Sequence, residues 1–165
     1  MQLKKVNKVS MLILILCFGI AGFLFFEWYI DNSTPRKLDT TEMTQQQNEN
    51  SIFSIENACI ADGYIEIDGW AFIKGMPLSK VNRSIVLKSC DQSDLAYRLD
   101  TSMIEREDVK ESYPEEESYK NAGFRARGRV KKCKAGTYEI WLCIKDTKEN
   151  AEWWNLGQTI EIGEQ

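Results

Sequence analysis

The sequence contains no histidine at all. That absence excludes a Ser-His-Asp triad, a Cys-His nucleophile pair, an HExxH zinc helix and a histidine-based pH switch. Proline and glycine are also scarce, with 3 and 10 residues in a chain of 165, so the composition is neither collagen-like nor that of a disordered protein. A chain of this length holds one ordinary domain with short appendages, which excludes a multidomain enzyme.

Long hydrophobic runs are absent except for one near the N-terminus. Residues 11–26 carry no charge, and the apolar stretch extends over 9–30, roughly 33 Å of helix at about 1.5 Å per residue, which is enough to cross a hydrocarbon core of about 30 Å. Lys4, Lys5 and Lys8 precede it without any acidic residue, so the positive-inside rule places the N-terminus in the cytoplasm. We expect a cytoplasmic tail (1–8) and a single-pass transmembrane helix (9–30) in the lipid bilayer of the cell membrane, with the rest of the chain outside.

A cleaved secretory signal peptide is the alternative to this anchor. Cleavage needs small residues in an Ala-x-Ala pattern after the apolar region. No such pattern follows the segment, which favours the uncleaved anchor without closing the alternative.

Residues 31–51 are rich in Thr, Gln, Asn and Glu and poor in apolar side chains. Such a segment buries too little surface to offset its ordering entropy, so we expect a flexible linker. Three of the 21 basic residues and one of the 25 acidic residues precede residue 31, which leaves a net charge of -6 for residues 31–165. This acidic balance argues against nucleic-acid binding, which depends on neutralising phosphates.

From residue 52 onward the apolar residues recur with period two, and turn residues interrupt them at short intervals. This pattern is typical of a β-sandwich or β-barrel. The Asp62-Gly63 pair before an alternating run predicts a tight hairpin. We expect strands over 52–60, 64–72, 84–87, 95–99, 124–130, 137–144 and 158–162. About seven strands in a domain spanning 52–165 predict an all-β fold, an immunoglobulin-like β-sandwich.

Four cysteines follow the apolar segment, which itself contains Cys17. An even number of cysteines in an oxidising compartment indicates disulfides. In an up-and-down sandwich Cys59, Cys90 and Cys133 fall near turns at one end, whereas Cys143 lies roughly 20 Å away, beyond the bridging limit of about 7 Å between Cα atoms. We expect a disulfide between Cys90 and Cys133. We expect no metal site, because the sequence has neither a CxxC spacing nor a histidine.

Several short motifs follow one another in this part of the chain. They are Gly69-Trp70-Ala71, Arg106-Glu107-Asp108-Val109, Tyr113-Pro114, Ala122-Gly123-Phe124 and Gly136-Thr137-Tyr138. In this order they resemble the Ig-like accessory domain of bacterial surface-polysaccharide glycosyltransferases and related envelope proteins, over about residues 62–146. The resemblance implies an Ig-like sandwich in a bacterial cell envelope, and a shared sandwich does not by itself fix an activity.

The connection over 101–121 is the main irregular segment. Its length marks it as a candidate functional loop or a short helical crossover. Its candidate residues are Arg106, Asp108 and Tyr113. We expect Arg106 and Asp108 to pair and to pin the loop. Upstream, Trp70 and Phe72 are expected to cover one sheet face, as large aromatic side chains do in sandwiches.

A basic row follows in the next expected strand. Arg125, Arg127, Arg129 and Lys131 alternate with small or apolar residues, so their side chains should project from one face of the strand. Such a row could bind an anionic polymer, such as teichoic acid or acidic capsule, through repeated charge-assisted hydrogen bonds. The alternative is a solvated sheet face that the acidic loop over 105–117 neutralises.

Three tryptophans are concentrated near the C-terminus. Trp141 has the parity of Cys143 and should face away from its two immediate neighbours. Together with Trp153 and Trp154 it could form an aromatic platform for sugar rings, or it could pack as the core of the second sheet.

Taken together, these patterns predict a membrane-anchored, non-catalytic, extracytoplasmic binding or interaction module of the cell envelope. We expect no cofactor, and as partner an anionic envelope polysaccharide or a membrane protein. One alternative is an accessory subunit that recruits a surface-polysaccharide synthesis enzyme through protein contacts. Another is a small envelope hydrolase that uses Glu115, Glu116 or Glu117, which needs a cleft that a sandwich of this size seldom provides.

Overall fold

The computed structural model describes residues 8–32, 34–41, 43, 50–146 and 151–164. The chain divides into two compact units, residues 1–32 and residues 33–165. Lys4 and Lys5, on which the predicted orientation depends, lie outside the described residues.

The first unit contains a single described helix, α1 (Lys8–Asn32). Its described side chains, those of residues 10–26, are all exposed. Twelve large apolar side chains on this stretch are at least half exposed, from Met11 at 60% to Phe26 at 58%. Among the helices that the structure describes, none combines the length and the hydropathy needed to cross a membrane. The transmembrane helix over 9–30 stays a prediction.

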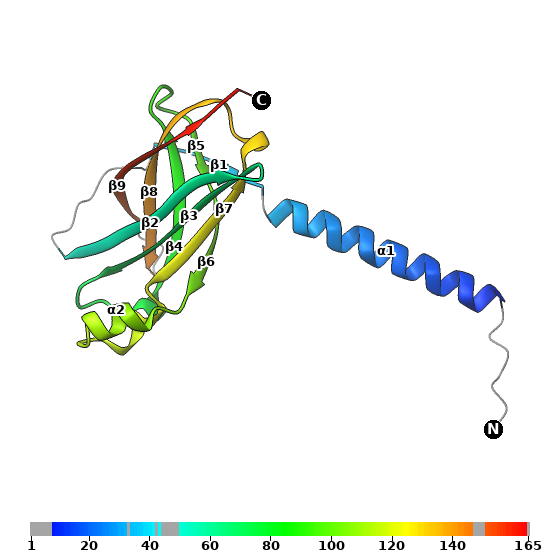
Figure 1. The fold of residues 1–165 in the computed structure, drawn as a ribbon, viewed down its shortest axis with the longest axis horizontal. Helices are drawn as coiled ribbons and strands as arrows, with labels where there is room; N and C mark the ends of the chain where they lie inside the picture. The colour runs from blue at the N-terminus through cyan, green and yellow to red at the C-terminus, as the bar shows by residue number, and fades with distance from the viewer. Residues whose placement is uncertain (1–7, 33, 42, 44–49, 147–150, 165) are drawn as a thin grey trace. The chain divides into compact units, whose positions relative to one another are not determined.

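The second unit consists of two antiparallel sheets (Figure 1). The four-stranded sheet has the order β2 (Ser51–Ala61), β3 (Tyr64–Ile73), β7 (Gly123–Arg129) and β6 (Asp100–Ile104). The five-stranded sheet has the order β1 (Arg36–Leu38), β5 (Ala96–Arg98), β4 (Val81–Ser89), β8 (Gly136–Asp146) and β9 (Ala151–Ile162). The helical segments are short: α2 (Glu107–Ser112) and the 3-10 turns η1 (Leu78–Lys80), η2 (Glu117–Asn121) and η3 (Val130–Lys132). The predicted all-β character of this part of the chain is confirmed.

The two sheets share one apolar core. Ile65 and Ile67 of β3 and Ile85 and Leu87 of β4 are fully buried in it. They are alternate residues of their strands, as expected when one face of each sheet is turned inward. The period-two pattern in the sequence therefore predicted correctly which of these residues face the core.

The predicted hairpin at Asp62-Gly63 is also confirmed. β2 pairs with β3 from Ala61 and Tyr64 outward. Asp62 has a φ of 51° and Gly63 a φ of 77°, the left-handed conformation at both central residues that a type I′ turn requires. Asp tolerates this region better than most residues and glycine adopts it freely.

Two of the nine described strands were not predicted as such. The first residues of the expected irregular segment over 101–121 continue as β6 in the four-stranded sheet. The chain changes sheets between β5 and β6, where the Leu99 amide still donates to the carbonyl of Ile85 in β4 at 2.9 Å. The remainder of the segment forms α2 and η2, the short helical crossover that was one of the two expectations.

The other additional strand, β1, overturns the expected flexible linker over the described part of 31–51. Lys37 pairs with Tyr97 of β5, and Pro35 is buried. Met43 is only 7% exposed. The composition of this segment is polar, but Leu38 and Met43 pack on the outer face of the five-stranded sheet, and that is why the expectation of a free linker was wrong.

That outer face carries a second apolar cluster. Its members are Val86, Ala96, Trp141, Cys143 and Trp153 from the sheet together with Met43 and, partly buried, Leu38 and Ala151. Left open to water, two buried tryptophans would cost several kcal/mol of apolar exposure. The segment from β1 to Met43 therefore acts as a strap over this face, and we call it the strap (residues 36–43, of which 42 lies outside the described residues).

Candidate functional site

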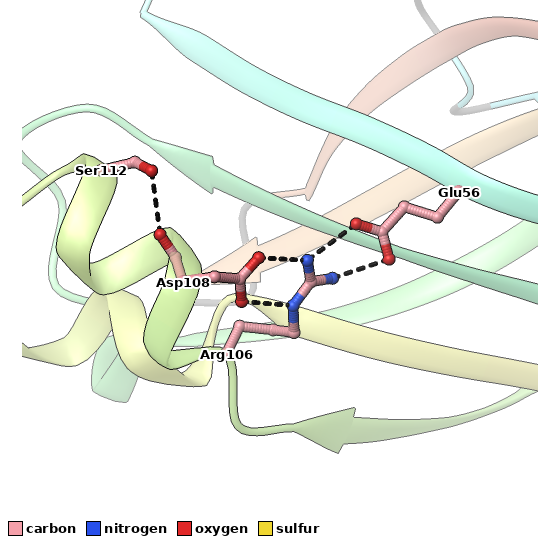
Figure 2. A network of polar contacts seen from close by, with 4 residues as sticks. All are labelled: Glu56, Arg106, Asp108 and Ser112. Atoms are coloured by element: carbon pink, nitrogen blue, oxygen red, sulfur yellow. Dashed lines mark hydrogen bonds and ion pairs between the residues drawn. The ribbon is translucent and has the colours of Figure 1, made fainter.

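The loop candidate Arg106 lies at the centre of an ion-pair network (Figure 2). Its Nε donates to Asp108 Oδ1 at 2.8 Å and its second terminal nitrogen to Asp108 Oδ2 at 2.6 Å. The guanidinium also donates to both carboxylate oxygens of Glu56, at 2.8 and 2.7 Å. The predicted pairing of Arg106 with Asp108 is confirmed. Glu56 was missed, because it comes from β2, fifty residues earlier in the chain.

The network fixes the charge of its members. Hydrogen bonds from Arg106 hold the pKa of the Asp108 carboxyl below its usual range, and hydrogen bonds to Asp108 and then Glu56 raise the pKa of Arg106. A carboxyl that stays ionised at neutral pH is a poor general acid. The Arg106 network thus ties the loop to β2.

The third loop candidate, Tyr113, packs on aromatic residues. Its ring meets Phe72 edge-on with centroids 4.9 Å apart, and it lies 6.1 Å from Trp70. Phe72 also stacks on Tyr119 at 4.1 Å, and the Tyr119 hydroxyl accepts from the Gly75 amide at 2.7 Å. Trp70 and Phe72 are stacked 6.0 Å apart on the outer face of the four-stranded sheet, as predicted, and α2 and η2 cover that end of the face (Figure 1).

Four of the five motifs that carry the family resemblance lie at this same end of the four-stranded sheet, whereas Gly136-Thr137-Tyr138 begins β8 in the other sheet and pairs there with Ser89 and Ile162. Gly69 of β3 pairs with Phe124 of β7, and Trp70 pairs with Gly123. A Cβ atom at Gly123 would lie 2.6 Å from the carbonyl oxygen of Ile104 and 2.7 Å from Arg106 Cγ. Glycine is therefore required at 123 by close approach, although its backbone conformation is one that any residue adopts. Packing accounts for these motif residues without a ligand.

A buried arginine holds the two sheets together at this end. Arg83 of β4 is 5% exposed and donates to the carbonyls of Ala71 (2.9 Å), Ala122 (2.7 Å) and Asn121. Burial lowers its pKa to about 10, so it remains charged at neutral pH. Arg83 was not predicted from the sequence, although it has the same inward parity as Ile85 in β4, and a charged residue at such a position was a usable signal.

The basic row on β7 is confirmed in its parity for three of its four members. Arg125, Arg127 and Arg129 alternate with the buried Ala126 and Gly128. Lys131 departs from the prediction, because the strand ends at Arg129 and Lys131 belongs to the 3-10 turn η3.

The row is neutralised at one end only. Arg125 pairs with Asp68 at 2.6 Å and Arg127 with Glu66 at 3.2 Å. Both carboxylates belong to β3, the neighbouring strand, and not to the acidic loop that was expected to supply them. The loop acids pair elsewhere, as Glu117 does with Lys110 at 3.3 Å.

At the other end of the row an open pocket of about 390 Å³ adjoins the β2–β3 turn. We call it the Tyr64 pocket, and its lining consists of Asp62, Gly63, Tyr64, Arg129, Lys131 and Lys132. Three cations and one carboxylate give this lining a net charge of +2. A smaller depression of about 190 Å³ lies between the two paired arginines, Arg106 and Arg125, and the carboxylates Glu56 and Asp68, so its charges already balance. The Tyr64 pocket is the stronger candidate for an anionic ligand.

The three tryptophan candidates are not gathered on an open surface. Trp141, Trp153 and Trp154 are 4%, 5% and 2% exposed. Trp154 lies in the core between the sheets, whereas the other two lie in the cluster under the strap. Of the two predicted alternatives, packing holds for all three, because successive residues of a strand point to opposite faces and both faces of this sheet are covered.

The predicted bridge between Cys90 and Cys133 is not formed, and all five cysteines are free thiols. Cys90 is exposed, whereas Cys133 packs against the core. Burial raises the pKa of the Cys133 thiol to about 12. One thiol faces solvent and the other faces the interior, which is the physical reason that these two sulfurs do not meet. Within the described ranges no group of His, Cys, Asp or Glu side chains is arranged to hold a metal ion.

Comparison with known proteins adds no assignment: no protein-family model, curated protein or solved structure matches this chain.

Proposed function

We propose that this chain is a membrane-anchored binding module of the bacterial cell envelope. In this proposal residues 9–30 span the cell membrane with the N-terminus inside, and an Ig-like β-sandwich outside the membrane binds an anionic surface polysaccharide without catalysing a reaction. The observation that carries the binding step is the net positive Tyr64 pocket at the unneutralised end of the β7 basic row.

The exposed apolar surface of α1 supports the anchor. Full burial of a large apolar side chain in an apolar environment stabilises it by about 1.5–3 kcal/mol relative to exposure to water. Twelve such side chains are exposed between Met11 and Phe26, around the whole circumference of a helix rather than along one stripe. A helix that is apolar all round is typical of a segment surrounded by lipid. In the proposed arrangement the acyl chains of the bilayer surround this apolar surface.

The strand order supports the Ig-like type. In that fold one sheet has the strand order A-B-E-D and the other C-F-G, with strand C′ added beside C in some members. When β2 is taken as A, the order β2-β3-β7-β6 corresponds to A-B-E-D, and β9-β8-β4-β5 corresponds to G-F-C-C′. The strap strand β1 adds to the C′ edge and has no counterpart in the core pattern.

A hydrolase is the less well supported alternative. Glycoside hydrolysis needs one carboxylic acid with a raised pKa beside a second carboxylate in a cleft. Asp108 and Glu117 have lowered pKa values because of Arg106 and Lys110 respectively. Both side chains therefore favour the ionised form that a general acid cannot use.

Retention of the full-length chain on immobilised polymers tests the proposal. The chain is solubilised in neutral detergent and applied to poly(glycerol phosphate), polygalacturonate and neutral dextran at low salt and at about 0.5 M salt, where the Debye length falls to about 4 Å. We expect retention on an anionic polymer at low salt, loss of it at high salt, and no retention on dextran. Absence of retention on both anionic polymers at low salt would contradict the proposal and direct the search to protein partners in the membrane.

A further inference from the structure

We infer that the Tyr64 pocket, and not the basic strand row as a whole, is where the polymer is gripped, through one anionic group, a phosphate diester or a carboxylate, held by Arg129, Lys131 and Lys132. This inference deepens the proposed function and rests on it. It names the subsite and the chemistry of the group that the subsite recognises.

The cations along β7 differ in their ion pairing. Arg125 and Arg127 each have a carboxylate partner on β3, so an incoming anion would have to compete with Asp68 or Glu66. Among the described residues, Arg129, Lys131 and Lys132 have no ion pair at 4.0 Å or less. An anion reaching these three cations displaces only water.

Contacts around Tyr64 and Gly63 hold the pocket in shape. The guanidinium of Arg127 lies 3.7 Å from the Tyr64 ring centroid, and that of Arg129 lies 5.6 Å from it. The Val130 amide donates to the Gly63 carbonyl at 3.0 Å, which holds η3, the turn that carries Lys131, against the β2–β3 turn. Cations held in place before the ligand arrives lose less entropy on binding.

The size and charge of the pocket define the ligand. An open volume of about 390 Å³ lies at the lower end of the range for small-ligand sites, about 300–1,000 Å³, which is enough room for one anionic group. Asp62 at the rim repels a densely charged group but leaves the lining net positive. Phosphate and carboxylate share the recognised feature, an anionic oxygen pair, and the two polymers below distinguish them.

The test compares two double variants with the same net charge in the full-length chain. Lys131→Glu with Lys132→Glu reverses two cations of the pocket, both exposed. The control, Lys74→Glu with Lys145→Glu, reverses the charge of two lysines outside the pocket lining. Lys74 directly follows β3, and Lys145 lies near the C-terminal end of β8. Dissociation constants are measured for poly(glycerol phosphate) and for polygalacturonate, and thermal unfolding checks that each variant is folded.

We expect the pocket variant to lose at least about tenfold in affinity for the polymer that the wild type binds, the equivalent of one lost charge-assisted contact, and the control to change less than about threefold. The polymer that shows this difference identifies the anionic group. Equal losses in both variants would overturn the inference, because binding would then follow overall charge. If the pocket variant bound the polymer as tightly as the wild type, the inference about the pocket would be overturned as well. The proposed function would still stand in that case, because the wild type binds the polymer. Failure of the wild type to bind either polymer would instead contradict the proposed function itself.

Discussion

The strap packs on the outer face of the five-stranded sheet, and truncation of the Met43 side chain tests whether this packing stabilises the fold. Met43 is 93% buried against the cluster that contains Trp141 and Trp153. Replacing a buried methionine by alanine costs about 2–5 kcal/mol. Since Met43 lies on the outer face of the sheet and not in the core between the sheets, we expect Met43→Ala to lower the free energy of unfolding by about 2 kcal/mol, the lower end of this range.

Urea unfolding of residues 33–165, followed by tryptophan fluorescence, measures this loss. With a slope of about 1–3 kcal/mol per molar urea, the midpoint should fall by roughly 1 M. Met103→Ala is the matched control, because Met103 is 42% exposed on β6, and its midpoint should stay close to that of the wild type. Equal midpoints for the wild type and both variants would refute the strap and restore the free linker that the composition favoured.

Three further predictions concern individual side chains. Arg83→Met should lower the free energy of unfolding by about 3 kcal/mol, because the hydrogen bonds from the buried guanidinium to three carbonyls are lost; urea midpoints measure this loss, and an unchanged midpoint would contradict the bridging role. Cys90 should react with iodoacetamide well before Cys133, whose pKa burial raises to about 12; peptide mass spectrometry gives the order, and the reverse order would show that Cys133 is not in the core. Asp108→Asn should destabilise the protein at neutral pH, and this loss should shrink as the pH falls below about 4. Because Arg106 lowers the Asp108 pKa in the folded state, the carboxylate contributes stability above about pH 4 that is lost as the pH falls through the lowered value, so a loss that is constant with pH would contradict the pairing.

The sequence predicted the fold where one face of a strand decides the pattern. Ile65 and Ile67 alternate with polar residues, and an Asp-Gly pair between two such strands is typical of a two-residue hairpin turn. The pairing of Arg106 with Asp108 was also predictable, because the two residues are close in sequence.

The failures have a different physical origin. The linker was judged from its composition, but burial of Met43 depends on an uncovered apolar face more than forty residues away in the sequence, which local composition does not report. The partners of Arg125 and Arg127 depend on the register of β3 against β7, and no local pattern specifies that register. The same register places Arg129 opposite Tyr64 and not opposite a carboxylate, and this leaves the lining of the Tyr64 pocket net positive.

The central claim is that the Tyr64 pocket binds an anionic polymer, and the affinity of the intact chain for poly(glycerol phosphate) and polygalacturonate tests it most directly. We predict that the wild type binds at least one of them at low salt and that Lys131→Glu with Lys132→Glu weakens this binding at least about tenfold relative to the control with the same net charge. Binding of equal strength by the pocket variant and the wild type would contradict it.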